Sequence, residues 1–104
     1  MASVRVARTE EVPVGTGKVV QAAGKAVALF NIGGTFYAVD NRCTHVGGPL
    51  GQGKVEGNVV TCPWHGSRFR LTDGSVCRGP ATFPQPRLET RVRGGQVEVR
   101  GRQG

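Results

Sequence analysis

Long apolar segments are missing from this sequence, which has no hydrophobic run near the ~20 residues that a membrane-spanning helix needs. The first six residues lack the basic-then-apolar layout of a secretory signal peptide. Helix-favouring residues never recur at a 3.6-residue spacing over a long segment. We therefore expect a soluble, cytoplasmic protein that is built mainly from strands.

Cysteine, histidine and acidic residues are also scarce. Three cysteines are too few for the disulfide framework of a small secreted scaffold, and there are only two histidines. Seven acidic residues stand against 14 basic ones, for a formal net charge of +7. That charge favours acidic partners such as protein surfaces, phosphates or anionic lipid, but it is also typical of a plain solvated surface.

The 104 residues are instead rich in glycine and in short β-prone runs. The 17 glycines are about twice the usual share, and the runs lie between turn signals such as Gly33-Gly34 and Gly94-Gly95. Two stretches, 41–53 and 62–86, lack any periodicity, and functional residues are often found in such loops. We expect one all-β domain with antiparallel strands at residues 4–8, 18–22, 26–30, 35–39, 54–56, 58–61, 88–92 and 96–100.

Both histidines follow a cysteine closely, one pair in each irregular stretch. Cys43-Thr44-His45 is separated by 16 residues from Cys62-Pro63-Trp64-His65. Thiolates and imidazoles are metal ligands, and a binuclear iron–sulfur cluster can take two thiolates on one iron and two imidazoles on the other. This mixed order predicts one [2Fe–2S] cluster held by Cys43, His45, Cys62 and His65.

Other uses of these residues remain open at this point. A structural zinc ion also takes four Cys and His ligands, although zinc fingers usually group Cys with Cys and His with His. A Cys–His nucleophilic pair is a further alternative, but nothing suggests a third orienting group. Cys77 falls outside both motifs, and we expect it to be a small buried hydrophobic residue, with a reactive thiol as the alternative.

The motifs C-T-H and C-P-W-H-G-S resemble the signature of the Rieske [2Fe–2S] family, and the flanking residues 40–42 and 79–81 also look like family features. The resemblance implies a stack of small antiparallel sheets, with the cluster at the tip between two loops and a proline loop that contains Pro80 alongside. It implies a single Rieske domain over residues 1–104, with a cluster-binding subdomain at about 41–84.

Departures from the family pattern bear on the reduction potential. High-potential Rieske proteins carry a disulfide between cysteines at the positions of Gly48 and Trp64, and a tyrosine where Phe69 stands. The resemblance therefore implies a cluster without those features, in the low part of the range of about −150 to +300 mV.

We expect the remaining residues around the cluster to assist it in different ways. Gly66, like the glycines at 47, 48, 51 and 53, gives the backbone close access to the cluster, and Ser67 donates to a bridging sulfide. Trp64 is either a hydrophobic lid over the cluster or a core residue. Arg68, Arg70 and Arg78 form either a solvated edge or a docking patch.

The resemblance implies an electron carrier and not an enzyme, since both histidines are used and no 2-His-1-carboxylate iron site can be built. We expect a monomeric ferredoxin that passes electrons from a reductase to a terminal oxygenase, such as an aromatic-ring hydroxylating dioxygenase. Its partners would present acidic docking surfaces, and nucleic acid and membranes are not expected as partners. The expected exit surface for the electron consists of His45, His65, Pro49, Leu50 and Pro63.

Two other functions are compatible with the sequence. The chain could be the small Rieske subunit of a nitrite reductase or arsenite oxidase type of enzyme. It could also be a zinc-bound nucleic-acid-binding module, which the net charge of +7 suggests. The sequence offers neither a recognition helix nor an aromatic RNA-binding signature for that last alternative.

Overall fold

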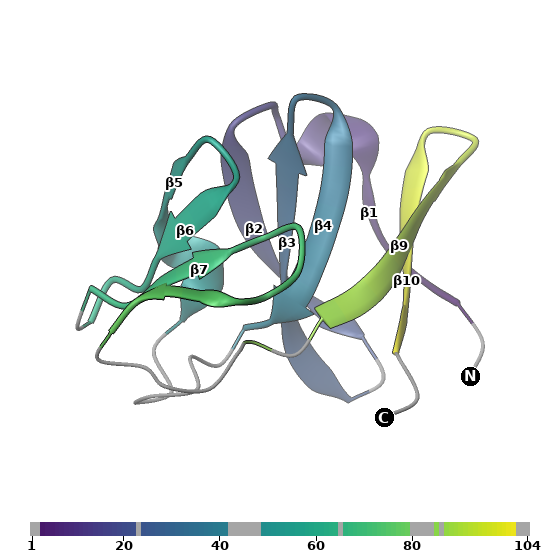
Figure 1. The fold of residues 1–104 in the computed structure, drawn as a ribbon. Coiled ribbons are helices and arrows are strands. Elements are labelled where there is room, and N and C mark those ends of the chain that lie inside the picture. The colour runs from purple at the N-terminus through teal and green to yellow at the C-terminus, as the bar shows by residue number, and fades with distance from the viewer. Residues whose placement is uncertain are drawn as a thin grey trace.

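Two antiparallel sheets make up the part of the chain that the computed structural model describes, which is residues 3–22, 24–41, 49–64, 66–79, 85 and 87–101. The six-stranded sheet has the order β1-β10-β9-β4-β3-β2, and the four-stranded sheet has the order β5-β6-β7-β8. Figure 1 shows the small sheet on one side of β2 to β4 and the β9–β10 hairpin on the other.

The larger sheet consists of β1 (Val4–Arg8), β2 (Thr16–Ala22), β3 (Lys25–Ile32), β4 (Thr35–Asp40), β9 (Arg87–Arg93) and β10 (Gln96–Gly101). The smaller sheet consists of β5 (Lys54–Glu56), β6 (Val59–Thr61), β7 (Arg68–Arg70) and β8 (Val76–Arg78). Two short 3₁₀ turns, η1 (Thr9–Glu11) and η2 (Leu50–Gln52), are the helical elements of the described residues. None of the helices among those residues is long and apolar enough to span a membrane.

Strand β3 lies between two hydrophobic cores, which explains why its residues 26–30 are apolar without interruption. Val27 and Leu29 pack into a core with β1, β2, β9 and β10, whereas Ala28 and Phe30 face a second core beneath the small sheet. All four side chains are fully buried. Successive side chains of a strand point to opposite faces, so a strand covered on both faces needs apolar residues at every position.

The second core fixes the small sheet to the larger one. Strands β6 and β7 contribute Val60 and Phe69 to this core, and Leu71 follows directly after β7. The turn η2 contributes Leu50. Each is at most 1% exposed. Because burying a side chain of this size stabilises a protein by about 1.5–3 kcal/mol, this core holds the elements that flank the predicted cluster loops.

Paired glycines close the two long hairpins at the predicted places. Gly33 and Gly34 have φ values of 62° and 95°, and Gly94 and Gly95 have values of 57° and 78°. Two-residue hairpin loops of the favoured type require positive φ at both central residues, which glycine adopts without steric cost. The strands expected at each end of the chain are confirmed, as is the β2–β3–β4 meander.

The stretch 62–86 differs from the expectation, because it contains strands β7 and β8. Each strand has three residues, which is too short to show a period-two pattern, and a register shift interrupts their pairing. The first irregular stretch likewise contains η2.

Candidate metal centre

Cys62 is the one predicted cluster ligand that the structure describes. Cys43, His45 and His65 lie outside the described residues, as do Gly48 and Pro80 from the predicted surroundings. Within the described ranges, no group of three or more His, Cys, Asp or Glu side chains gathers in one place. The convergence of the four ligands therefore stays a prediction, and the described parts of the two loops provide the geometry.

The Cys62 thiol is buried at the end of β6. It is free of any disulfide, is 1% exposed and packs against the second core. The Cys62 backbone N–H donates to the carbonyl of Ser67 at 2.7 Å, and the Gly66 N–H donates to the carbonyl of Cys62 at 3.1 Å. These bonds bring Gly66 and Ser67 back to Cys62 in a tight turn, with Gly66 at a φ of +77°. Hydrogen bonds thus hold the backbone at a buried thiol, and thiolates are the ligands that iron–sulfur clusters use.

Asn41 closes the base of the first loop. Its carbonyl accepts a hydrogen bond from the Leu50 N–H at 2.8 Å, and its side-chain Oδ1 accepts one from the Gly51 N–H at 2.7 Å. Its own N–H donates to Ala26 of β3 at 3.2 Å. Residue 41 thus holds both ends of the segment that contains Cys43 and His45, and its role was not apparent from the sequence.

Gln85 joins the two loop regions from a third segment. Its side-chain Nε2 donates to the Asp40 carbonyl at 2.5 Å, and its backbone N–H donates to the Gly74 carbonyl at 2.7 Å. Gln85 is 2% exposed. It therefore ties the end of β4, next to Asn41, to the turn between β7 and β8, a link across 45 positions that local sequence patterns do not reveal.

Two expectations for the surroundings of the centre were wrong. Cys77 is exposed, because it lies on the edge strand β8 and it is its neighbour Val76 that packs against the second core. Leu50 is fully buried in the second core, so it cannot form part of an exit surface. Pro63 is exposed and Pro49 is half-buried, and both stay candidates for that surface.

Trp64 is exposed to solvent, whereas Phe69 is buried. The Trp64 side chain is 60% exposed, which excludes the core alternative and leaves its role as a lid a prediction. Phe69 is 1% exposed within the second core and brings no hydroxyl to this site. Ser67 is fully buried beside the Cys62 turn.

The glycines near the predicted cluster loops are explained by two different local requirements. A Cβ at Gly51 would lie 2.5 Å from Cγ2 of Val19, and a Cβ at Gly53 would lie 2.3 Å from the carbonyl oxygen of Thr61. Packing against strands β2 and β6 therefore requires glycine at these two positions, independently of any cluster. At Gly66 an added Cβ meets nothing within 4 Å, and the positive φ is what favours glycine there.

An open hollow of about 560 Å³ lies beside the Cys62 turn. The described residues that line it are Thr61, Gly66, Arg68, Arg78 and Gly79. Arg68 and Arg78 are directly opposite each other on β7 and β8. The hollow therefore adjoins the predicted cluster loop and is lined by two cationic side chains.

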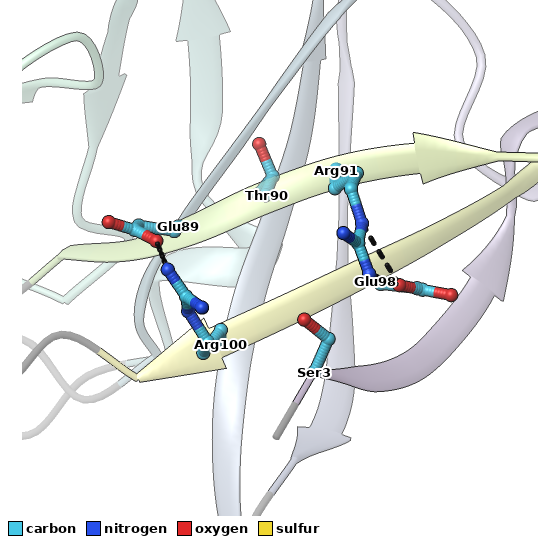
Figure 2. Close-up of a pocket in the computed structure, with 6 residues that line it drawn as sticks. All are labelled: Ser3, Glu89, Thr90, Arg91, Glu98 and Arg100. Atoms are coloured by element: carbon cyan, nitrogen blue, oxygen red, sulfur yellow. Dashed lines mark hydrogen bonds and ion pairs between the residues drawn. The ribbon is translucent and has the colours of Figure 1, made fainter. Parts of the chain in front are cut away.

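A smaller hollow of about 220 Å³ lies on the larger sheet, over β9 and β10 (Figure 2). Arg91 pairs with Glu98 at 2.8 Å, and Arg100 pairs with Glu89 at 2.6 Å, across β9 and β10. The hydrogen bond from Arg91 holds the pKa of Glu98 below its ordinary value. These arginines are satisfied within the sheet, so we assign this hollow a structural role.

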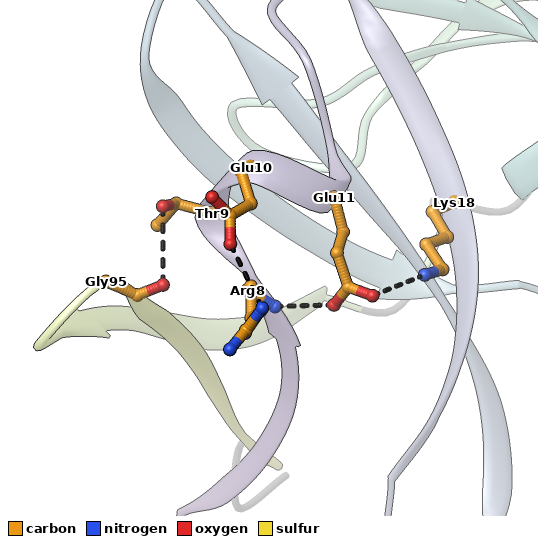
Figure 3. A network of polar contacts seen from close by, with 6 residues as sticks. All are labelled: Arg8, Thr9, Glu10, Glu11, Lys18 and Gly95. Carbon is orange, nitrogen blue, oxygen red and sulfur yellow. Dashed lines mark hydrogen bonds and ion pairs between the residues drawn. The ribbon is translucent and has the colours of Figure 1, made fainter.

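A second polar network joins η1 to its neighbours (Figure 3). Glu11 accepts a hydrogen bond from the Arg8 N–H at 2.7 Å and pairs with Lys18 at 3.4 Å. The Arg8 N–H, and then Lys18, hold the pKa of Glu11 below its ordinary value. The Thr9 N–H donates to the Gly95 carbonyl at 3.0 Å, which fixes η1 to the β9–β10 turn.

Comparisons with known proteins agree with this arrangement. The profile of the Rieske [2Fe-2S] domain matches residues 2–91. Ferredoxin CarAc of Metapseudomonas resinovorans is 33% identical over 99 residues, which cover 94% of this chain and 92% of that protein. The 3-phenylpropionate/cinnamic acid dioxygenase ferredoxin subunit of Escherichia coli (strain K12) is 38% identical over 74 residues, which cover 70% of each chain.

The fold comparison gives the same result. A chain in the complex of reduced oxygenase and oxidized ferredoxin in carbazole 1,9a-dioxygenase superimposes with a TM-score of 0.91 at 31% identity, over 98% of this chain and 95% of that one. The ferredoxin of carbazole 1,9a-dioxygenase from Nocardioides aromaticivorans IC177 gives 0.92 at 25% identity, over 98% and 100%.

The fold, the buried Cys62 turn and the family match define an iron–sulfur protein of the electron-transfer class. The chain belongs to the Rieske [2Fe–2S] domain family, and it is a ferredoxin-type electron carrier with one [2Fe–2S] cluster. The buried Cys62 thiol, the tight turn that follows it, and the hydrogen bonds of Asn41 at both ends of the first loop fit that cofactor. When bound, the cluster stores and releases one electron.

Proposed function

We propose that this chain takes one electron from a reductase and delivers it to a terminal oxygenase, such as an aromatic-ring hydroxylating dioxygenase. The observation that carries this proposal is the similarity over nearly the whole chain to a ferredoxin of a carbazole dioxygenase system. One such ferredoxin occurs in a complex with its oxygenase. The carrier is proposed to be a soluble, cytoplasmic monomer.

The proposed ligands are Cys43 and Cys62 for one iron and His45 and His65 for the other. The buried, hydrogen-bonded setting of Cys62 supports its part in this set. The hydrogen bonds that Asn41 accepts from the N–H groups of Leu50 and Gly51 support fixed ends for the loop that carries Cys43 and His45. We further propose one domain over residues 1–104, with a cluster-binding subdomain at about 41–84.

Other residues of the proposed subdomain act on the cluster through its environment. Ser67 supplies a hydroxyl, Gly66 a close backbone and Trp64 an apolar cover, while Gly48 and Pro80 complete the surrounding loops. Phe69 supports a low reduction potential, because a phenyl ring donates no hydrogen bond to a ligand sulfur. A redox titration should give a midpoint in the low part of the range of about −150 to +300 mV, and a value above roughly +200 mV would contradict the assignment.

The test of the ligand set is electron paramagnetic resonance on the dithionite-reduced protein. The wild type should show the average g value of mixed His and Cys ligation. Cys43→Ser and Cys62→Ser should lose that signal and most of the iron, whereas Cys77→Ser should keep both, because Cys77 is exposed and outside the motifs. A wild type without iron, or a Cys77→Ser variant that loses its cluster, would contradict the proposed ligands.

The partner assignment needs a separate measurement. The rate at which the reduced protein reduces a purified aromatic-ring dioxygenase should fall as salt is added, because salt screens attraction between exposed charges beyond a Debye length of about 10 Å at 0.1 M. A rate that does not change with salt would remove electrostatic steering from the proposal, and no electron transfer at any salt concentration would remove the oxygenase itself.

A further inference from the structure

Two arginines are placed directly opposite each other beside the Cys62 turn. Arg68 of β7 is the register partner of Arg78 of β8, and both side chains line the hollow that also contains Gly66 and Gly79. Like charges at directly opposite positions of neighbouring strands destabilise a sheet. The sheet therefore keeps an unfavourable arrangement at this place.

Little within the described part of the chain compensates this arrangement. Glu56 reaches Nη2 of Arg68 at 3.5 Å, and the Glu56 side chain is itself 55% exposed. The Nε of Arg68 is buried and finds no hydrogen-bond partner among the described residues. Among those residues, the guanidinium group of Arg78 makes no ion pair or side-chain hydrogen bond either. A buried donor without a partner is unfavourable, and the other N–H groups of the two guanidinium groups remain available to an incoming acceptor.

We propose that this hollow receives a carboxylate side chain of the protein with which the chain exchanges electrons. A carboxylate has two acceptor oxygens, can bind a guanidinium group in a bidentate manner and neutralises the repulsion between Arg68 and Arg78. Gly66 and Gly79 place no side chain in its way. This inference rests on the proposed function and adds where the partner docks and with which chemical group.

The position of the hollow suits that role. Gly66 belongs to the turn that begins at Cys62, so an Asp or Glu side chain in the hollow would fix the partner next to the proposed cluster loop. The overall charge of +7 attracts the same kind of surface from a distance. The net charge thus attracts an acidic partner over long distances, and the pair of Arg68 and Arg78 sets the position in which the partner binds.

The first test measures equilibrium binding of a fluorescein-labelled hexaglutamate peptide to the cluster-loaded protein, by fluorescence anisotropy at low salt. A hexaglutamine peptide is the matched control. Arg68→Gln and Arg78→Gln should each weaken hexaglutamate binding about five- to tenfold, as expected for loss of a charge-assisted hydrogen bond. Arg78→Gln is the cleaner variant, because Arg68 also pairs with Glu56.

Two further variants remove the same charge elsewhere. Arg70→Gln alters an exposed arginine of β7 that does not line the hollow, and Arg93→Gln alters one at the end of β9, on the opposite side from the small sheet (Figure 1). Each should weaken binding less than about twofold, as for a surface charge in water. Equal effects of Arg78→Gln and Arg93→Gln, or equal binding of both peptides, would overturn the inference.

The second test uses small oxidants of opposite charge on the dithionite-reduced protein. Arg78→Gln should slow oxidation by the ferric EDTA anion and leave oxidation by the hexaammineruthenium(III) cation unchanged or faster. If the cluster signal is normal and the arginine variants match the wild type, the docking inference alone fails. If the protein binds no iron, the proposed function fails instead.

Discussion

The hairpins β7–β8 and β9–β10 both have arginines at directly paired cross-strand positions, but the residues opposite these arginines carry different charges. In β9–β10, Arg91 is opposite Glu98 and Arg100 is opposite Glu89, with ion pairs at 2.8 and 2.6 Å. In β7–β8, an arginine is opposite another arginine. The first hairpin satisfies its charges within the fold, whereas the second leaves cationic groups for a partner. Strand geometry alone does not decide which role an arginine has.

The two hairpins also differ in what holds them. Strand β10 pairs with β9 over six consecutive residue pairs, whereas β7 and β8 share two pairs separated by a register shift. The short hairpin depends instead on Phe69 in the second core and on the contact between Gly74 and Gln85. Variants of matched residues in the two hairpins can separate these contributions.

The largest difference should come from the apolar anchor of the short hairpin. Phe69→Ala should lower the free energy of unfolding by about 3–5 kcal/mol, because it leaves a cavity in the second core. Val92→Ala in β9, where the side chain is 51% exposed, should change it by less than about 0.5 kcal/mol. Urea denaturation followed by circular dichroism measures both. Similar losses for the two variants would show that the small sheet does not depend on this core.

The next largest difference should come from the turn glycines. Gly74 and Gly95 have nearly equal φ values of 76° and 78°, but a Cβ at Gly74 would lie 2.3 Å from the Gln85 carbonyl oxygen, and a Cβ at Gly95 would meet nothing within 4 Å. Gly95→Ala should cost about 1–2 kcal/mol for the positive φ alone. Gly74→Ala should cost about 1–3 kcal/mol more, because of the steric overlap. Equal costs would mean that the Gln85 segment moves freely away from the turn.

A smaller effect should follow from exchanging the charge patterns of the hairpins. Arg78→Glu creates an Arg–Glu pair in β7–β8 and should raise the free energy of unfolding by about 0.2–1 kcal/mol. Glu98→Arg creates an Arg–Arg pair in β9–β10 and should lower it by a similar amount. A stabilised Arg78→Glu variant that also loses hexaglutamate binding would show that the native Arg68–Arg78 pair lowers the stability of the fold but is needed to bind carboxylates. If Arg78→Glu lowered stability, the native pair would not be unfavourable.

The smallest effect should be the pH dependence of the Arg91–Glu98 pair. Because Arg91 lowers the pKa of Glu98 in the folded state, the pair stabilises the fold above the unfolded-state pKa of a glutamate, and this contribution is lost as the pH falls through the lowered value. The difference in unfolding midpoint between wild type and Glu98→Gln should thus be present near neutral pH and vanish in acid. A difference that persists at low pH would assign the effect to packing instead of charge.

Much of the larger sheet could be predicted from the sequence, because its signals are local. The glycine pairs at 33–34 and 94–95 mark hairpins that the structure confirms. Strands β7 and β8 were missed, since three residues with a register shift carry no readable period. The burial expected for Cys77 was wrong for the same reason: without a strand, its position on an exposed edge could not be anticipated.

The candidate site divides in a similar way. The spacing of Cys43, His45, Cys62 and His65 predicts a ligand set, and the structure adds a buried, hydrogen-bonded setting for Cys62. The contacts that position the loops are long-range. Gln85 bonds to a carbonyl 45 positions away, and no periodicity or local motif indicates such a pairing.

The hydrogen bonds at Asn41 affect how the protein can change over evolution. Since the Asn41 carbonyl and Oδ1 accept from the N–H groups of Leu50 and Gly51, the entry and exit of the intervening segment are fixed to each other and to β3. The strands below are thus anchored by residues 41, 50 and 51 and not by the proposed ligands Cys43 and His45. Substitutions in the intervening segment at positions other than those two ligands can therefore alter the electron carrier while the same scaffold is inherited.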